Sequence, residues 1–154
     1  MEIIMFVDPS GSGRLAYDLF LDGEATVEET VTRVRPWRYR SVWLPTATAF
    51  EMAGIIEAMM AANRLMETLT PHRLDGWILT VYNDNGYAAE YSYPNWHTAE
   101  SVAANCADHL LPLAELAWAL STSLQSRGVI IRLCAHHVVD CLAEYDMSTV
   151  ARML

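Results

Sequence analysis

The chain has 154 residues, of which 53% are hydrophobic, and carries a formal net charge of −9 with an isoelectric point near 4.8. This length fits one domain, and this hydrophobic content excludes a disordered chain. The negative charge disfavours nucleic acid and anionic membranes, because affinity for both comes mainly from Lys and Arg. All ten basic residues are arginine, which excludes lysine Schiff-base chemistry and a Walker phosphate loop.

The absence of a membrane-span pattern, a signal-peptide pattern and a disulfide pattern indicates the compartment and the domain organisation of the chain. No apolar run approaches the length of a membrane span, and the N-terminal "MEIIMFVDPS" has no basic region typical of a signal peptide. The odd number of cysteines does not indicate a disulfide framework. We therefore expect a single cytoplasmic domain over 1–154, with no membrane association and no cofactor.

The first 44 residues favour strands. The apolar, β-branched segment 2–7 and the alternating segment 14–23 predict two strands around the turn cluster "DPSGSG". Segment 26–35 is ambiguous, because its valines fit a helical stripe whereas its Val and Thr content favours a strand. A strand is slightly preferred, since 38–44 then completes a meander.

A long amphipathic helix is predicted next. The segment 48–69 opens with a capping box at Thr48 and Glu51, and its apolar residues recur at intervals of three and four. Its methionines could line an adaptable binding groove. Core packing is the preferred interpretation, because such stripes usually face a core; these methionines are Met52, Met59, Met60 and Met66.

The C-terminal half alternates strands and helices. A hairpin is predicted around Asn85-Gly86, and a long helical segment over 98–128 is expected to be kinked or divided by Pro112. A buried strand at 129–135 and a closing helix at 138–154 follow. The predicted fold is α+β, an antiparallel sheet of about five or six strands with two main helices packed on one face.

The segment "LCAHHVVDC" at 133–141 is the densest group of reactive side chains. If a helix begins at Val138, His137 and Cys141 share one face, which is a spacing that can hold a metal. No further ligand pattern completes such a site, although Cys106 and His109 are available. We therefore favour packing and expect neither a metal nor a catalytic residue; the cluster comprises Cys134, His136, His137, Asp140 and Cys141.

A second group of note is "RVRPWRYR" at 33–40, in which four arginines are interleaved with Trp37 and Tyr39. Arginine with aromatic residues can bind single-stranded nucleic acid or phosphate. The preferred interpretation is internal pairing with acids on a neighbouring strand, because the chain is acidic overall.

Five acids without a base lie between positions 18 and 29 and suggest a surface for a basic protein partner. We expect a non-enzymatic acidic binding protein that neutralises its partner, as immunity proteins and phage-encoded inhibitors such as anti-CRISPR proteins do. The alternatives are a small hydrolase or transferase using the cluster at 134–141, and a secretion or assembly chaperone; a homodimer is left open. The expected partner-binding residues are Asp18, Asp22, Glu24, Glu28, Glu29 and Trp37.

Overall fold

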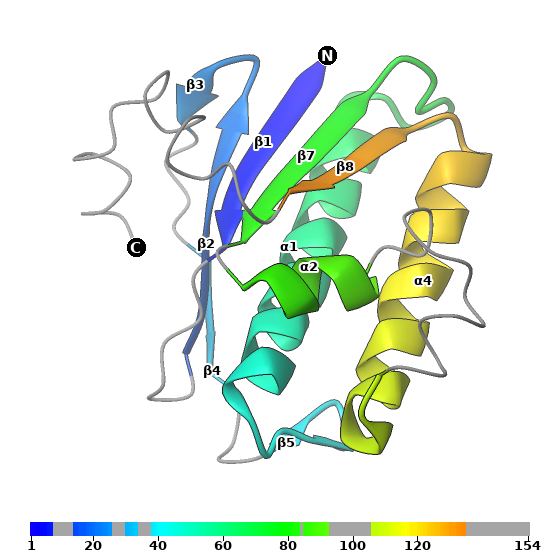
Figure 1. Cartoon of the computed structure of the whole chain (residues 1–154). Coiled ribbons are helices and arrows are strands. Elements are labelled where there is room, and N and C mark those ends of the chain that lie inside the picture. Colours follow the sequence, from blue (N-terminus) through cyan, green and yellow to red (C-terminus); the bar gives the residue numbers. More distant parts are fainter. Residues whose placement is uncertain (8–13, 26–29, 34–37, 84, 93–105, 135–154) are drawn as a thin grey trace.

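A computed structural model describes residues 1–7, 14–25, 30–33, 38–83, 85–92 and 106–134 (Figure 1). The longer strands are β1 (Glu2–Val7), β2 (Arg14–Leu21), β7 (Ile78–Asn83) and β8 (Ile130–Cys134). The shorter strands are β3 (Glu24–Ala25), β4 (Thr30–Arg33), β5 (Arg38–Tyr39) and β6 (Val42–Trp43). The helices are α1 (Ala47–Leu69), α2 (Gly86–Ser92), the 3₁₀-helix η2 (Asp108–Leu110) and α4 (Leu111–Ser126).

The main sheet is mixed. Its order is β3-β2-β1-β7-β8, and β4 also pairs with β2. Strand β1 runs antiparallel to β2 but parallel to β7, and β7 is parallel to β8. The α+β class is confirmed, whereas the antiparallel sheet is corrected: four longer strands form its body, and β3 and β4 are short additions to β2. The β5–β6 pair is a separate sheet and does not complete the predicted meander.

Helical connections explain the parallel strands, because a chain that returns through a helix enters the sheet in its original direction. Strand β4 is antiparallel to β2 and so runs in the direction of β1, and helix α1 lies in the chain between β4 and β7. Helices α2 and α4 lie between β7 and β8. The predicted hairpin at Asn85-Gly86 is wrong, because Gly86 begins α2. The Asn85 side chain accepts a hydrogen bond from the Ala88 amide at 3.0 Å, so this asparagine starts a helix instead of forming a hairpin turn.

Helix α1 confirms the predicted long amphipathic helix. It begins at Ala47, two residues earlier than the predicted capping box at Thr48 implies, because the N-cap is Thr46, whose hydroxyl accepts from the Ala49 amide at 3.3 Å. It ends at Leu69, where the Thr70 amide bonds to the Met66 carbonyl. Met52, Met59 and Met66 have no exposed surface and Met60 is partly buried against the same core, which confirms their predicted role in core packing.

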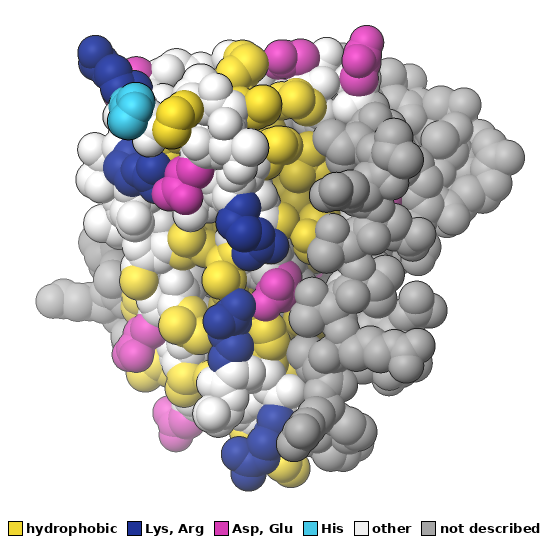
Figure 2. Space-filling model, turned by 180° about the vertical axis from the view of Figure 1, so that it is seen from behind, with side chains coloured by type: hydrophobic (Ala, Val, Ile, Leu, Met, Phe, Trp, Pro, Cys, Tyr) yellow, Lys and Arg dark blue, Asp and Glu magenta, His cyan; other side chains and the backbone are white. Residues whose placement is uncertain are grey.

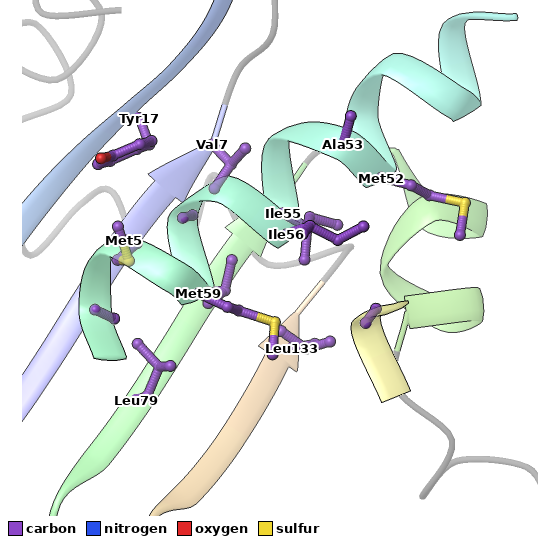
Figure 3. Packing of buried hydrophobic residues seen from close by; sticks show 14 of the residues in the cluster. Met5, Val7, Tyr17, Met52, Ala53, Ile55, Ile56, Met59, Leu79 and Leu133 are labelled. Carbon is purple, nitrogen blue, oxygen red and sulfur yellow. The ribbon is translucent and has the colours of Figure 1, made fainter. Parts of the chain in front are cut away.

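One hydrophobic core joins the helices to one face of the sheet (Figure 3). Alternate strand residues such as Met5, Leu79 and Leu133 meet Ile55 and Met59 of α1, as the period of two in a strand requires. The opposite face of the sheet carries a smaller cluster of aromatic and aliphatic side chains; its members are Ile4, Phe6 and Phe20, with Tyr82 packed against them.

The C-terminal part is described up to Cys134. Pro112 lies in the first turn of α4, where its missing amide costs nothing, so within 106–128 it opens a helix rather than dividing one. Strand β8 confirms a strand within 129–135, but only one of its faces is buried: Ile131 and Leu133 lie in the core, whereas Ile130 and Arg132 are exposed. Residues 93–105 and the predicted closing helix at 138–154 lie outside the described residues.

Among the described helices, none is both long and apolar enough to cross a membrane.

Candidate functional site

The carboxyl ends of β1 and β7 lie side by side (Figure 1), and the last residues that pair there are Val7 and Asn83. The chain leaves β1 towards β2 on one side, whereas β7 and β8 lie on the other side. In open sheets with parallel strands, ligands bind outside the carboxyl ends of the strands where the connections diverge in this way. The fold therefore directs attention to this end of the sheet.

Asn83 organises this end of the sheet. Its side chain is 1% exposed, and its Nδ2 donates to the Val7 carbonyl at 3.1 Å and to Glu51 Oε2 at 2.6 Å. Its Oδ1 accepts from the Asn85 amide at 2.9 Å. One buried side chain thus joins β1, β7 and α1, and it holds a carboxylate at the strand ends.

Glu51 reaches the strand ends because it lies near the beginning of α1, the helix that packs on β1 and β7. The sequence assigned Glu51 to a capping box, but the described hydrogen bond of its carboxylate is to Asn83. Asn85 Nδ2 lies 3.3 Å from Thr48 Oγ1, which ties the start of α2 to the same turn of α1. Three elements therefore fix the position of Glu51.

Two further carboxylates adjoin this network in the sequence. The chain continues from Val7 into Asp8 and from Asn83 into Asp84, and both aspartates lie outside the described residues. Each is therefore one residue from the Val7–Asn83 pair. Our sequence analysis missed them, although the signal was present: an aspartate directly follows each of two apolar strands.

Metal-binding side chains elsewhere do not form an alternative site in the described part of the chain. No group of three His, Cys, Asp or Glu residues there is arranged to hold a metal ion. Of the cluster at 133–141, Cys134 ends β8, whereas His136, His137, Asp140 and Cys141 lie outside the described residues.

The two other metal-ligand candidates have separate surroundings. Burial, reinforced by the Asp108 carboxylate, raises the pKa of the Cys106 thiol, so this cysteine is a poor thiolate. His109 Nε2 lies 3.1 Å from Thr46 Oγ1, beside the start of α1. Neither feature indicates nucleophilic or metal chemistry.

The expected acidic binding segment is divided by the fold. Asp18 is 2% exposed on β2 opposite Phe6, because alternation along the strand turns it to the face that carries the aromatic cluster. Asp22 and Glu24 are exposed at the β2–β3 turn, and Asp22 Oδ1 accepts from the Glu2 amide at 2.8 Å. Glu28, Glu29 and Trp37 lie outside the described residues.

The arginine-rich segment 33–40 contributes one described ion pair. Arg40 lies 3.3 Å from Glu57, so its acidic partner is on α1 rather than on a neighbouring strand. The Tyr39 hydroxyl also donates to Glu57, at 2.5 Å. Burial, followed by this hydrogen bond, raises the pKa of Tyr39.

Comparison with known proteins gives no family or relative from which a function could be inferred. No protein-family model matches the chain, and no curated protein matches it.

Proposed function

We propose that this protein is a divalent-metal-dependent hydrolase of phosphate esters, with Asp8, Glu51 and Asp84 as its metal ligands. The observation that carries this proposal is the hydrogen bond from buried Asn83 to Glu51, made at the in-register ends of β1 and β7. Asp8 and Asp84 directly follow Val7 and Asn83 in the sequence.

The ligand chemistry supports magnesium or manganese. Carboxylate oxygens suit these hard cations, and Mg²⁺ is usually bound by one or two carboxylates together with water and substrate phosphate. A metal at this position would neutralise phosphate charge and lower the pKa of a bound water. That water would attack phosphorus while the P–O bond to the leaving group breaks, and the leaving oxygen would take up a proton from solvent. A resident cation also explains how a lysine-free chain of net charge −9 could accept an anionic substrate.

Asn83 serves as a positioning residue in this proposal. Carboxylate ligands are commonly held by hydrogen bonds from neighbouring groups, and loss of such a bond weakens metal binding. Asn83 donates to Oε2 of Glu51 and so fixes the orientation of this carboxylate. The Val7 carbonyl shares the same amide nitrogen and thereby fixes the side-chain orientation of Asn83.

The test is hydrolysis of bis(p-nitrophenyl) phosphate with Mg²⁺ or Mn²⁺. We expect metal-dependent release of p-nitrophenol by the wild type, and a loss on the order of 100-fold in Glu51→Gln and Asp84→Asn. Glu67→Gln is the matched control, because Glu67 is a surface residue of α1 that pairs with Arg127. No metal-dependent hydrolysis by the wild type, or full activity of Glu51→Gln, would contradict the proposal.

Protein binding remains a second candidate. Asp22 and Glu24 are exposed together at the β2–β3 turn of a chain with net charge −9, and this turn is the described surface that suits a partner with a basic face. A neutralising role of the immunity-protein or anti-CRISPR kind would use this surface.

The test of this second candidate is charge reversal. Asp22→Arg with Glu24→Arg should slow association at low salt with a partner obtained by affinity capture, while dissociation changes less. An unchanged association rate would exclude this turn from the interface.

A further inference from the structure

The β5–β6 hairpin is built with an unfavourable turn. Its central residues, Arg40 and Ser41, have φ angles of 47° and 69°, which is the left-handed region. Turns of this kind normally use Asn-Gly, because side chains other than glycine and asparagine are strained there. Strained backbone that the surrounding structure maintains is a recognised mark of functional segments.

A buried anchor holds this strained turn in place. Tyr39 is buried, and its hydroxyl donates to Glu57, which lies on α1. Arg40 Nε donates to the Tyr39 oxygen at 3.0 Å, and Arg40 Nη2 lies 3.3 Å from Glu57. The hairpin is therefore fixed to the helix by a network of three side chains, although it pairs with none of the other described strands.

The outer surface of the hairpin is cationic and aromatic. Arg38 pairs across the hairpin with Trp43, and its guanidinium lies 5.8 Å from the centre of the Trp43 ring. Trp43 is 51% exposed, and none of the described acidic residues forms an ion pair with Arg38. Tryptophan and arginine are the residue types that are enriched among the anchors of protein interfaces.

Further arginines extend this surface onto α1. Arg40 is half-exposed, and its Nη2 lies 3.3 Å from the sulfur of Met60. Arg64 is exposed one turn further along the same helix. Arginine side chains recur down the face of the molecule shown in Figure 2, with acidic side chains between them. We call Arg38, Arg40, Trp43 and Arg64 the hairpin surface.

We propose that the hairpin surface binds an acidic segment of a partner protein, with carboxylates on its arginines and an apolar side chain against Trp43. The local positive charge calls for an anionic partner, and Trp and Arg are the residue types that most often anchor protein interfaces. A polynucleotide fits less well, because its affinity needs many phosphate contacts and the chain carries a net charge of −9. This surface does not depend on the proposed metal site.

The test is selection from a displayed library of random 12-residue peptides on the full chain, with the double variant Arg38→Ala, Trp43→Ala used for counter-selection. We expect the selected peptides to be rich in Asp and Glu with an apolar or aromatic residue. Their affinity, measured by fluorescence anisotropy, should fall about tenfold or more in Trp43→Ala and recover in part in Trp43→Phe. Arg73→Ala is the control, because Arg73 is an exposed arginine that pairs with Asp75.

Three outcomes would overturn the proposal. The first is a selection that yields no peptide with a preference for the wild type over the double variant, and the second is a selection that yields only peptides without acidic residues. The third is tighter binding of a 20-residue oligothymidylate through Arg38 and Trp43, which would make the hairpin surface a nucleic-acid site. The thermal midpoint of Trp43→Ala should equal that of the wild type, which shows that the variant is folded without reference to the proposed metal site.

Discussion

At the scale of single residues, Asn83 and Tyr39 show how polar groups enter this core. Asn83 is almost completely buried, yet its amide donates two hydrogen bonds and accepts one. Tyr39 is buried against α1, and its hydroxyl bonds to Glu57. Buried polar groups are tolerated when they are paired, and removing one partner leaves the other unsatisfied. Each residue therefore makes a measurable prediction.

Asn83→Ala should lower the free energy of unfolding by about 1–3 kcal/mol, because it leaves the Val7 carbonyl without this donor and the Glu51 carboxylate without its amide. Urea denaturation measures the change. Asn63→Ala is the control, since Asn63 bonds to Arg127 on a more open surface and should cost about 0.5 kcal/mol or less. Equal effects of the two substitutions would show that the hydrogen bonds of buried Asn83 stabilise the fold no more than that of Asn63.

Tyr39 predicts a loss of stability in alkaline solution. Its pKa is raised in the folded state, chiefly by burial and then by the hydrogen bond to Glu57, so folding favours the neutral phenol. This contribution is complete below the unfolded tyrosine pKa of about 10 and is lost as the pH rises above it. Unfolding free energies between pH 8 and 11 should therefore fall more steeply for the wild type than for Tyr39→Phe. Tyr87→Phe, which alters a largely exposed tyrosine, should keep the wild-type slope.

At the scale of elements, periodicity predicted helix α1 and strands β1, β2 and β8 well, because each has a clear apolar pattern. It could not give strand direction, since parallel and antiparallel strands share the period of two. The error at Asn85-Gly86 has a local cause: asparagine favours both hairpin turns and helix caps, and only the tertiary structure selects between them. At the start of α1 the choice is between two threonines: either Thr46 or Thr48 could cap the helix, and the structure shows Thr46 as the cap.

Ile56→Ala tests the packing of α1 on the sheet. Ile56 is 2% exposed within the main core, so the substitution should cost about 2–5 kcal/mol in the free energy of unfolding. Leu69→Ala at the exposed end of the same helix should cost much less, within about 0.5 kcal/mol. A small effect at Ile56 would show that this face of the helix is not packed.

The turn between α4 and β8 depends on Gly128. Its φ is +96°, and a Cβ added there would lie 2.9 Å from the Cα of Asp75. Gly76 has a φ of +83° with no neighbouring atom within 4 Å, so it offers a matched comparison. Both alanine variants should suffer backbone strain of about 1–2 kcal/mol, whereas Gly128→Ala should lose more stability because of the clash with Asp75. Equal thermal midpoints would contradict the close approach of these two turns.

At the scale of the whole molecule, the topology brings together residues that are distant in sequence. Val7, Glu51 and Asn83 belong to three different elements, and the parallel pairing of β1 with β7 and the hydrogen bonds of Asn83 join them. The sequence showed which residues were acidic, but the proposed site depends on strand order, which periodicity does not encode. Conversely, Asp18, Asp22 and Glu24 are close in sequence, yet the fold buries the first and exposes the other two.

The proposed metal site is tested most directly by isothermal titration of the wild type and of Glu51→Gln with Mn²⁺. We predict saturable binding to the wild type and to the Glu67→Gln control, and affinity weakened at least tenfold in Glu51→Gln at an unchanged thermal midpoint in the absence of metal. Absence of Mn²⁺ binding by the wild type, or equal affinity in Glu51→Gln, would contradict the assignment of this end of the sheet as a metal site.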